Sequence, residues 1–153
     1  MPIRTQIDDL SSHASQQLVS EHLAGMHGHS PPGHVNALAV DGLRAPGVTF
    51  WTAWQGDDLC GCAALKALSA TCGELKSMRT RPAFLRQGVG QALLSEIVAT
   101  ARARGYTRLY LETGTGAPFE PAHALYRQNG FHWCDAFGDY EATAFNVFMV
   151  KAL

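Results

Sequence analysis

The chain reads Arg86-Gln87-Gly88-Val89-Gly90-Gln91 near its middle, and the apolar run Ala92-Leu93-Leu94 follows directly. Two glycines two residues apart therefore stand where a loop gives way to a helix. Glycine lets the backbone turn sharply and lets a ligand come close. The first turn of a helix has unpaired N–H groups and a partial positive charge. Residues 86–91, called the phosphate seat below, are thus predicted to bind a phosphate or pyrophosphate.

The segments on both sides of the phosphate seat set its place in a fold. Apolar residues recur at helical spacing from Val89 to Ala101, and Gly105 is predicted to end that helix, as glycine often does. Residues 74–80 alternate as a strand before the seat, with Glu74, Lys76, Met78 and Thr80 expected on one face. Residues 107–113 read as a strand after the helix. A strand–helix–strand order predicts a parallel pair of strands.

The remaining elements predict an α/β chain with a mixed sheet. Hydrophobic periodicity and turn residues indicate these elements. The expected strands are residues 4–7, 48–54, 59–68, 131–134 and 146–150; the expected helices run from 9 to about 26 and from 121 to 130; the expected break is 27–34.

Length, composition and charge bound the class of protein. The chain has 153 residues, enough for one domain covering 1–153, and its 46% hydrophobic and 16% charged residues are usual for a globular protein. A net charge of −1 gives no electrostatic case for nucleic acid or an anionic membrane. No apolar run reaches the roughly 18 residues of a membrane span. The first residues lack a signal-peptide pattern, so we expect a cytoplasmic protein.

Two sequence motifs carry a resemblance to a known family. The strand 74–80 followed by the phosphate seat is similar to the acetyl-coenzyme A motif of the GNAT family of N-acetyltransferases, Gln/Arg-x-x-Gly-x-Gly/Ala. Residues 122–131, Ala-His-Ala-Leu-Tyr-Arg-Gln-Asn-Gly-Phe, resemble its Ala-x-x-Leu-Tyr-x-x-x-Gly-Phe signature. Leu111-Glu112-Thr113-Gly114, Phe137-Gly138-Asp139-Tyr140 and Phe148-Met149 look like a bacterial subgroup of small acetyltransferases. One departure is that Leu85 occupies the family's Gln/Arg position.

The resemblance implies a fold and an activity. It implies a mixed sheet of six to seven strands flanked by about four helices, with strands 4 and 5 splayed apart to admit acetyl-CoA. It implies transfer of the acetyl group of acetyl-CoA to a primary amine, which we expect to belong to a small molecule. The alternative is a non-catalytic acyl-CoA-binding or sensing module on the same fold. Homodimers are common in the family.

The resemblance also implies where acetyl-CoA binds. Backbone groups of Met78 and Thr80, with Arg79 between them, would pair with the pantetheine arm as an added strand would. The phosphate seat, Arg86, Gln87, Gly88, Val89, Gly90 and Gln91, would hold the pyrophosphate. Backbone N–H groups supply most contacts of such a seat, so the Leu85 departure leaves it intact.

Acetyl transfer to an amine requires a proton donor for the departing thiolate and a route for the amine's own proton. By resemblance, Tyr126 lies near the sulfur, acts as general acid and contacts the cofactor; otherwise it is a buried helix aromatic. Glu74 is the candidate general base, as a glutamate is in the histone-acetylating branch; otherwise it pairs with Lys76. Glu112 is expected to bind a cationic substrate or to orient the following glycine loop.

The histidines and cysteines are given lesser roles. His22, His27, His29 and His34 cluster in sequence, but their spacing matches no metal motif and the reaction needs no metal. His29 and His34 are instead expected to line the acceptor pocket. The four cysteines form neither a zinc ribbon nor a redox Cys-x-x-Cys, and direct attack by an amine needs no nucleophilic thiol.

Overall fold

The protein, seen here as a computed structural model that describes residues 2–31, 33 and 38–153, forms one seven-stranded sheet. The strands lie in the order β1-β2-β3-β4-β5-β7-β6. Their bounds are β1 Arg4–Ile7, β2 Val48–Gln55, β3 Asp58–Ala67, β4 Cys72–Thr80, β5 Arg108–Thr113, β6 His132–Cys134 and β7 Val147–Ala152. Neighbours are antiparallel except β4 and β5, which are parallel. The predicted mixed α/β sheet is confirmed.

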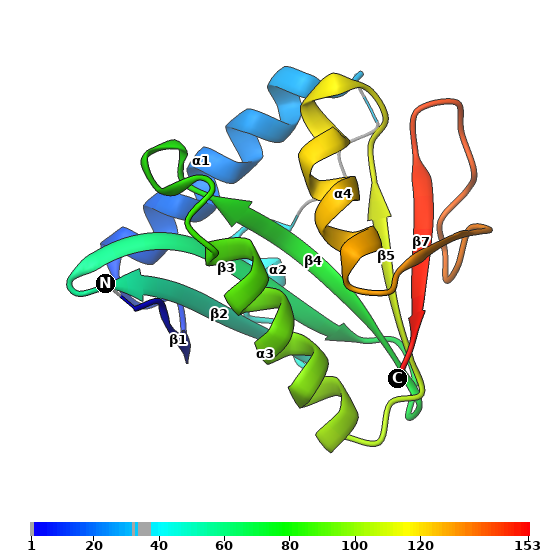
Figure 1. The fold of residues 1–153 in the computed structure, drawn as a ribbon, viewed down its shortest axis with the longest axis horizontal. Helices are drawn as coiled ribbons and strands as arrows, with labels where there is room; N and C mark the ends of the chain where they lie inside the picture. Colours follow the sequence, from blue (N-terminus) through cyan, green and yellow to red (C-terminus); the bar gives the residue numbers. More distant parts are fainter. Residues whose placement is uncertain (1, 32, 34–37) are drawn as a thin grey trace.

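Four α-helices cover the two faces of the sheet. Figure 1 shows α3 (Val89–Ala103) and α4 (Glu120–Gln128) over one face, with α1 (His13–His29) on the other. The short α2 (Val40–Leu43) packs with α1 in a core cluster that includes Leu18, Leu43 and Phe50. A second, larger cluster lies under α3 and α4. Among the described helices, none has the length and apolarity that a bilayer crossing requires.

Helix α1 differs from its predicted bounds because of its capping. The Ser12 side chain accepts a hydrogen bond from the Ser15 N–H, which fixes the helix start four residues later than predicted. Asp8 instead accepts from the Leu10 N–H and forms a turn before the helix. The helix also continues through His29, past Gly28, so the predicted break at 27 is wrong at its beginning.

The sheet opens between β4 and β5. Cys72–Leu75 pair with Arg108–Leu111, and the pairing ends at Leu75 and Leu111. Beyond this point β4 continues for five residues to Thr80 and β5 for two residues to Thr113, and in Figure 1 the strands diverge. The predicted splay of strands 4 and 5 is therefore confirmed. The carboxyl-terminal half of β4 presents an unpaired edge to the gap.

A bulge in β4 corrects the predicted facing of its side chains. Cys62 pairs with Arg79 but Ala64 pairs with Lys76, so β4 carries one residue more than β3 across this interval. Ser77 adopts φ of 54°, a left-handed backbone. The extra residue shifts the alternation by one. Lys76 therefore faces α1 with Glu74, whereas Met78 packs into the α3 cluster, so the expected single face from Glu74 to Thr80 is wrong.

Candidate active site

The phosphate seat has the backbone geometry that anion binding needs. Gly88 caps α3 in the left-handed conformation with φ of 86°, and Arg86 has φ of 61°. A Cβ added at Gly88 would meet no described atom within 4 Å, so the backbone is open to a ligand here. The N–H groups of the first helical turn lack intrahelical partners. The residues present therefore fit a pyrophosphate, as expected.

The beginning of α3 is fixed to the end of α4. Gln91 and Asn129 exchange two amide hydrogen bonds of 2.9 Å each. Asn129 also donates to the Leu125 carbonyl, at 2.8 Å. A Cβ added at Gly90 would lie 3.1 Å from the Leu125 Cδ2, which shows how closely the helices approach. The Gln91 side chain thus braces the two helices, and its backbone faces the seat.

The unpaired edge of β4 directs Thr80 toward the gap. The Arg81 N–H donates to the Cys60 carbonyl at 2.8 Å, so Arg81 makes its backbone bonds with β3. Successive residues of a strand direct their backbone groups to opposite sides. The N–H and carbonyl of Thr80 therefore point into the space between β4 and β5. The geometry supports the expected backbone pairing at Thr80.

The side chain of Arg79 lies on the acceptor face, away from the phosphate seat. A Cβ added at Gly25 of α1 would come within 2.4 Å of the Arg79 Nη1, so the guanidinium packs against α1. Thr80 faces the other way, because its Oγ1 lies 3.9 Å from the Cβ position of Gly90. Any role of Arg79 in binding the cofactor must therefore use its backbone.

A cavity of about 110 Å³ lies at the mouth of the gap between β4 and β5. It is lined from α1 by His22 and Met26, from β4 by Glu74, Leu75, Lys76, Ser77 and Met78, from β5 by Leu111, Glu112 and Thr113, and by Phe119, Ala122 and Tyr126. The predicted residues Glu74, Glu112 and Tyr126 thus meet in one cavity although they come from three different elements.

Tyr126 presents a proton-bearing hydroxyl to this cavity. The residue is 7% exposed, and among the described residues none hydrogen-bonds its hydroxyl. Burial, with the nearby Glu112 carboxylate, raises the pKa of Tyr126 well above its usual range. The hydroxyl is therefore protonated at neutral pH and has no competing acceptor.

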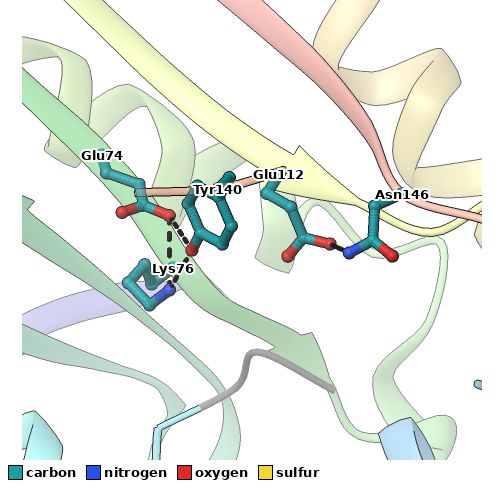
Figure 2. A network of polar contacts seen from close by, with 5 residues as sticks. All are labelled: Glu74, Lys76, Glu112, Tyr140 and Asn146. Carbon is teal, nitrogen blue, oxygen red and sulfur yellow. Dashed lines mark hydrogen bonds and ion pairs between the residues drawn. The ribbon is translucent and has the colours of Figure 1, made fainter. Parts of the chain in front are cut away.

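Glu74 belongs to a buried polar network. Its Oε2 accepts from the Tyr140 hydroxyl at 2.6 Å and lies 3.3 Å from the Lys76 Nζ, while Lys76 donates to the Tyr140 oxygen at 2.7 Å. Figure 2 shows the Lys76 amine and the Tyr140 hydroxyl converging on this oxygen. Two donors therefore share one oxygen of Glu74. An ion pair with Lys76 was one of the alternatives expected for Glu74, and the structure contains this ion pair.

Glu112 is held from the other side of the site. Its Oε2 accepts from the Asn146 amide at 2.5 Å, just before β7 (Figure 2). The Glu112 carboxylate influences both Tyr126 and Tyr140, so it lies near both side chains. Glu112 lines the same cavity as Tyr126, where a carboxylate can meet an incoming amine.

Two residues of the site received no role from the sequence, Tyr140 and Asn146. Tyr140 lies in an aromatic cluster with Tyr110, Phe137 and Phe148, with ring centroids 4.8–5.7 Å apart. This cluster holds the segment before β7 over the sheet. The stretch Phe137-Gly138-Asp139-Tyr140 marked a subgroup in the sequence, but only the fold brings its tyrosine to Glu74.

The histidines of the first helix separate in the structure. His22 is buried and lines the cavity, whereas His27 and His29 are exposed near the end of α1. His29 does not line the cavity, and His34 lies outside the described residues. No group of three or more His, Cys, Asp or Glu residues in the described part of the chain could hold a metal ion.

The cysteines have the properties of packing residues. Cys60 and Cys62 are fully buried, and all four cysteines are free. Burial raises the pKa of Cys62 to about 12, and burial also raises the pKa of Cys60 and Cys134. A thiol with a raised pKa is a poor nucleophile at neutral pH.

Comparisons with known proteins agree with this geometry. The model of the acetyltransferase (GNAT) family matches residues 15–131. The chain is 49% identical over 148 residues to the uncharacterized N-acetyltransferase YsnE of Bacillus subtilis, covering 97% of this chain and 98% of YsnE.

Solved structures share the whole fold. A structure described as an acyl-CoA N-acyltransferase from Klebsiella pneumoniae is similar with a TM-score of 0.80 and 25% identity, covering 99% of this chain and 97% of the other. A Bacillus subtilis acetyltransferase in complex with CoA is similar with a TM-score of 0.72 and 18% identity, covering 99% of both chains.

The fold and the site define the class of protein. The chain belongs to the GNAT family of acetyltransferases. It is an acyltransferase, and acetyl-CoA is its acetyl donor. The expectation of an enzyme is confirmed.

Proposed function

We propose that the protein transfers an acetyl group from acetyl-CoA to the primary amine of a small molecule by direct attack. The observation that carries this proposal is the cavity at the mouth of the β4–β5 gap, where Tyr126 and Glu112 face the same space. The cavity is small and set inside the fold, which favours a small acceptor over a protein surface. The buried cysteines support a route without a thiol nucleophile.

The residues divide the work between donor and acceptor. The phosphate seat, residues 86–91, holds the pyrophosphate, and the β4 edge at Met78 and Thr80 aligns the pantetheine arm. The amine nitrogen forms a bond to the thioester carbonyl carbon, and the carbon–sulfur bond breaks. Tyr126 gives its hydroxyl proton to the departing thiolate. Positioning of the two reactants supplies a large share of the rate.

The proton lost by the amine goes to Glu112 in this proposal, directly or through a water. Glu112 lines the same cavity as Tyr126 and attracts an ammonium ion before attack. Glu74 is less suited to be the base, because its Oε2 already accepts from the Tyr140 hydroxyl and lies 3.3 Å from the Lys76 Nζ. Glu74 instead positions these two side chains at the cavity wall.

The experiment is a thiol-release assay with acetyl-CoA and a panel of amines, applied to the wild type, Glu112→Gln and Glu74→Gln. We expect Glu112→Gln to lower kcat by about 10²-fold or more, as loss of a general base does. The exposed Glu96→Gln on α3 is the matched control. Binding of CoA without thiol release for any amine would contradict the proposed acceptor class. A larger loss for Glu74→Gln than for Glu112→Gln would assign the base to Glu74.

The cytoplasmic location and the homodimer expected from the sequence stay predictions. A size-exclusion measurement with light scattering on the purified protein would decide the oligomeric state.

A further inference from the structure

Two residues that line the cavity each have a buried polar atom without a hydrogen-bond partner among the described residues. His22 is 6% exposed, and its Nδ1 has no hydrogen bond. The Ser77 Oγ is likewise buried without a hydrogen bond. Both residues line the cavity, His22 from α1 and Ser77 from β4. Buried polar groups are normally satisfied, so two orphans beside one cavity indicate a ligand group that both would bind.

The bulge in β4 places Ser77 at the wall of the cavity. Ser77 is the extra residue of the bulge, and its φ of 54° is uncommon for a residue other than glycine. Its own carbonyl accepts from the Cys62 Sγ at 3.3 Å. Bulges next to active sites re-aim a side chain. The strain at this position is thus associated with a buried hydroxyl on a residue that lines the cavity.

Charge at this end of the cavity favours an anionic group. Lys76 lines the cavity and donates to Glu74 and Tyr140, which leaves its third N–H without a partner in the described chain. Arg79 packs behind His22 against Gly25, and its guanidinium makes no ion pair with a described residue. Glu74 is the opposing charge, and Lys76 compensates it at 3.3 Å.

His22 is a neutral donor in this environment. Burial, with the nearby Arg79, lowers the pKa of His22 to about 4. The imidazole is therefore uncharged at neutral pH, and one of its nitrogens carries a hydrogen. A neutral N–H, a hydroxyl and an ammonium hydrogen match the oxygens of a carboxylate.

We propose that His22, Ser77 and Lys76 bind a carboxylate on the acceptor, so that the acceptor is a free amino acid. Its amine then lies toward Glu112 and Tyr126, which line the same cavity. This inference rests on the proposed function for its chemistry, but the carboxylate site itself is a binding site and can be measured without acetyl transfer.

The first experiment measures binding. The protein saturated with CoA, which cannot react, is titrated by calorimetry with the 20 amino acids and with decarboxylated partners such as isopentylamine for leucine and phenethylamine for phenylalanine. We expect at least one amino acid to bind about 10²-fold more tightly than its amine, because a site built for hydrogen bonding rejects an analogue that lacks the group. No binding of any amino acid, or equal binding of each pair, would overturn the inference.

Variants assign the site. His22→Phe and Ser77→Ala should each weaken binding of the amino acid about tenfold or more and leave the Kd of CoA unchanged. His22→Asn, which places an amide donor near the position of Nδ1, should restore part of the affinity. The exposed His27→Phe on the same helix is the control. Equal losses for the amino acid and its amine would show a structural effect and overturn the assignment.

Turnover with acetyl-CoA separates the two proposals. Acetylation of amines without a carboxylate, together with no acetylation of amino acids, would keep the proposed function and overturn the amino-acid acceptor. Tight binding of an amino acid without thiol release would keep the carboxylate site and overturn the proposed chemistry.

Discussion

At the scale of single residues, the chemistry depends on hydroxyl and carboxyl groups whose partners come from distant parts of the chain. Tyr126 has a cavity in front of its hydroxyl and no bonded partner in the described structure. The Glu74 carboxylate pairs with Lys76 and accepts a hydrogen bond from Tyr140. In the proposed function, Tyr126 therefore donates a proton to the departing thiolate, and Glu74 positions Lys76 and Tyr140.

The substitution Tyr126→Phe should lower kcat by about 10²-fold or more, because only the proton donor is lost. The Kd of CoA and the unfolding free energy should change little, since the hydroxyl makes no hydrogen bond that folding would lose. Stopped-flow thiol release and calorimetry measure the two quantities, with Tyr106→Phe as the control. Unchanged kcat would remove Tyr126 from the mechanism.

The sequence predicted some site residues and missed others for a physical reason. Glycines at a loop-to-helix boundary have a local signature, so the phosphate seat was found from the residues themselves. Tyr140 reaches Glu74 across 66 positions of sequence through an aromatic cluster, and no local pattern encodes that contact. The other partner of Glu74, Lys76, lies two residues along the same strand, and the local spacing did suggest it.

At the scale of elements, α3 begins on a glycine that backbone geometry requires. Gly88→Ala should weaken CoA binding and cost about 1–2 kcal/mol of stability, because an L-residue is strained at φ of 86°. Gly105→Ala at the other end of α3 is a matched control, since its φ is 82° and its added Cβ would also meet nothing within 4 Å. Both variants should lose similar stability in denaturant titrations.

Only Gly88→Ala should lose affinity for CoA in calorimetry. Equal CoA affinity in the two glycine variants would mean that the start of α3 contributes nothing to the phosphate seat.

Helix α1 should make stability depend on pH through His22. The pKa of His22 falls from 6.5 in the unfolded chain to about 4 in the fold, so the unfolded state binds the extra proton between these values. The contribution of His22 to the free energy of unfolding is therefore fully present above pH 6.5. It declines by about 3 kcal/mol as the pH falls toward 4. Denaturant titrations of the wild type and His22→Phe should show a smaller decline in the variant. Parallel pH profiles would contradict the buried neutral imidazole.

The bulge in β4 is a feature of a single strand that its own sequence does not predict. Alternation along residues 74–80 looks regular, and the sequence gives no sign that Ser77 is inserted. Pairing with β3 determines the register, and that information lies in another strand. The existence of β4 was therefore predictable, whereas the face of Met78 and Thr80 was not.

At the scale of the whole molecule, a short contact joins two parts of the sheet. Strands β1–β4 and strands β5, β7 and β6 meet through four residue pairs between Cys72–Leu75 and Arg108–Leu111. A ligand that contacts both β4 and the α3–α4 side would add further contacts between the two parts of the sheet. The mixed sheet and the splay of strands 4 and 5 were predictable because two motifs with fixed separation resemble one family.

CoA at about 100 times its Kd should raise the unfolding free energy by about 2.7 kcal/mol, because it binds only the folded chain. For a chain of this size that corresponds to a Tm increase of about 5–10 °C. Differential scanning calorimetry with and without CoA measures it, and Gly88→Ala at the same CoA concentration should show a smaller increase. An equal increase in both proteins would place the ligand elsewhere.

The inserted residue in β4 divides the strand into two parts that have separate roles in the proposed function. In the proposed function, Glu74 and Lys76, before Ser77, face the molecule that receives the acetyl group, whereas the backbone of Met78 and Thr80, after it, binds the molecule that supplies it. Substitutions before Ser77 can therefore change which acceptor binds and leave the binding of acetyl-CoA unchanged. Relatives that share the donor machinery are free to diverge in what they acetylate through changes only a few positions away.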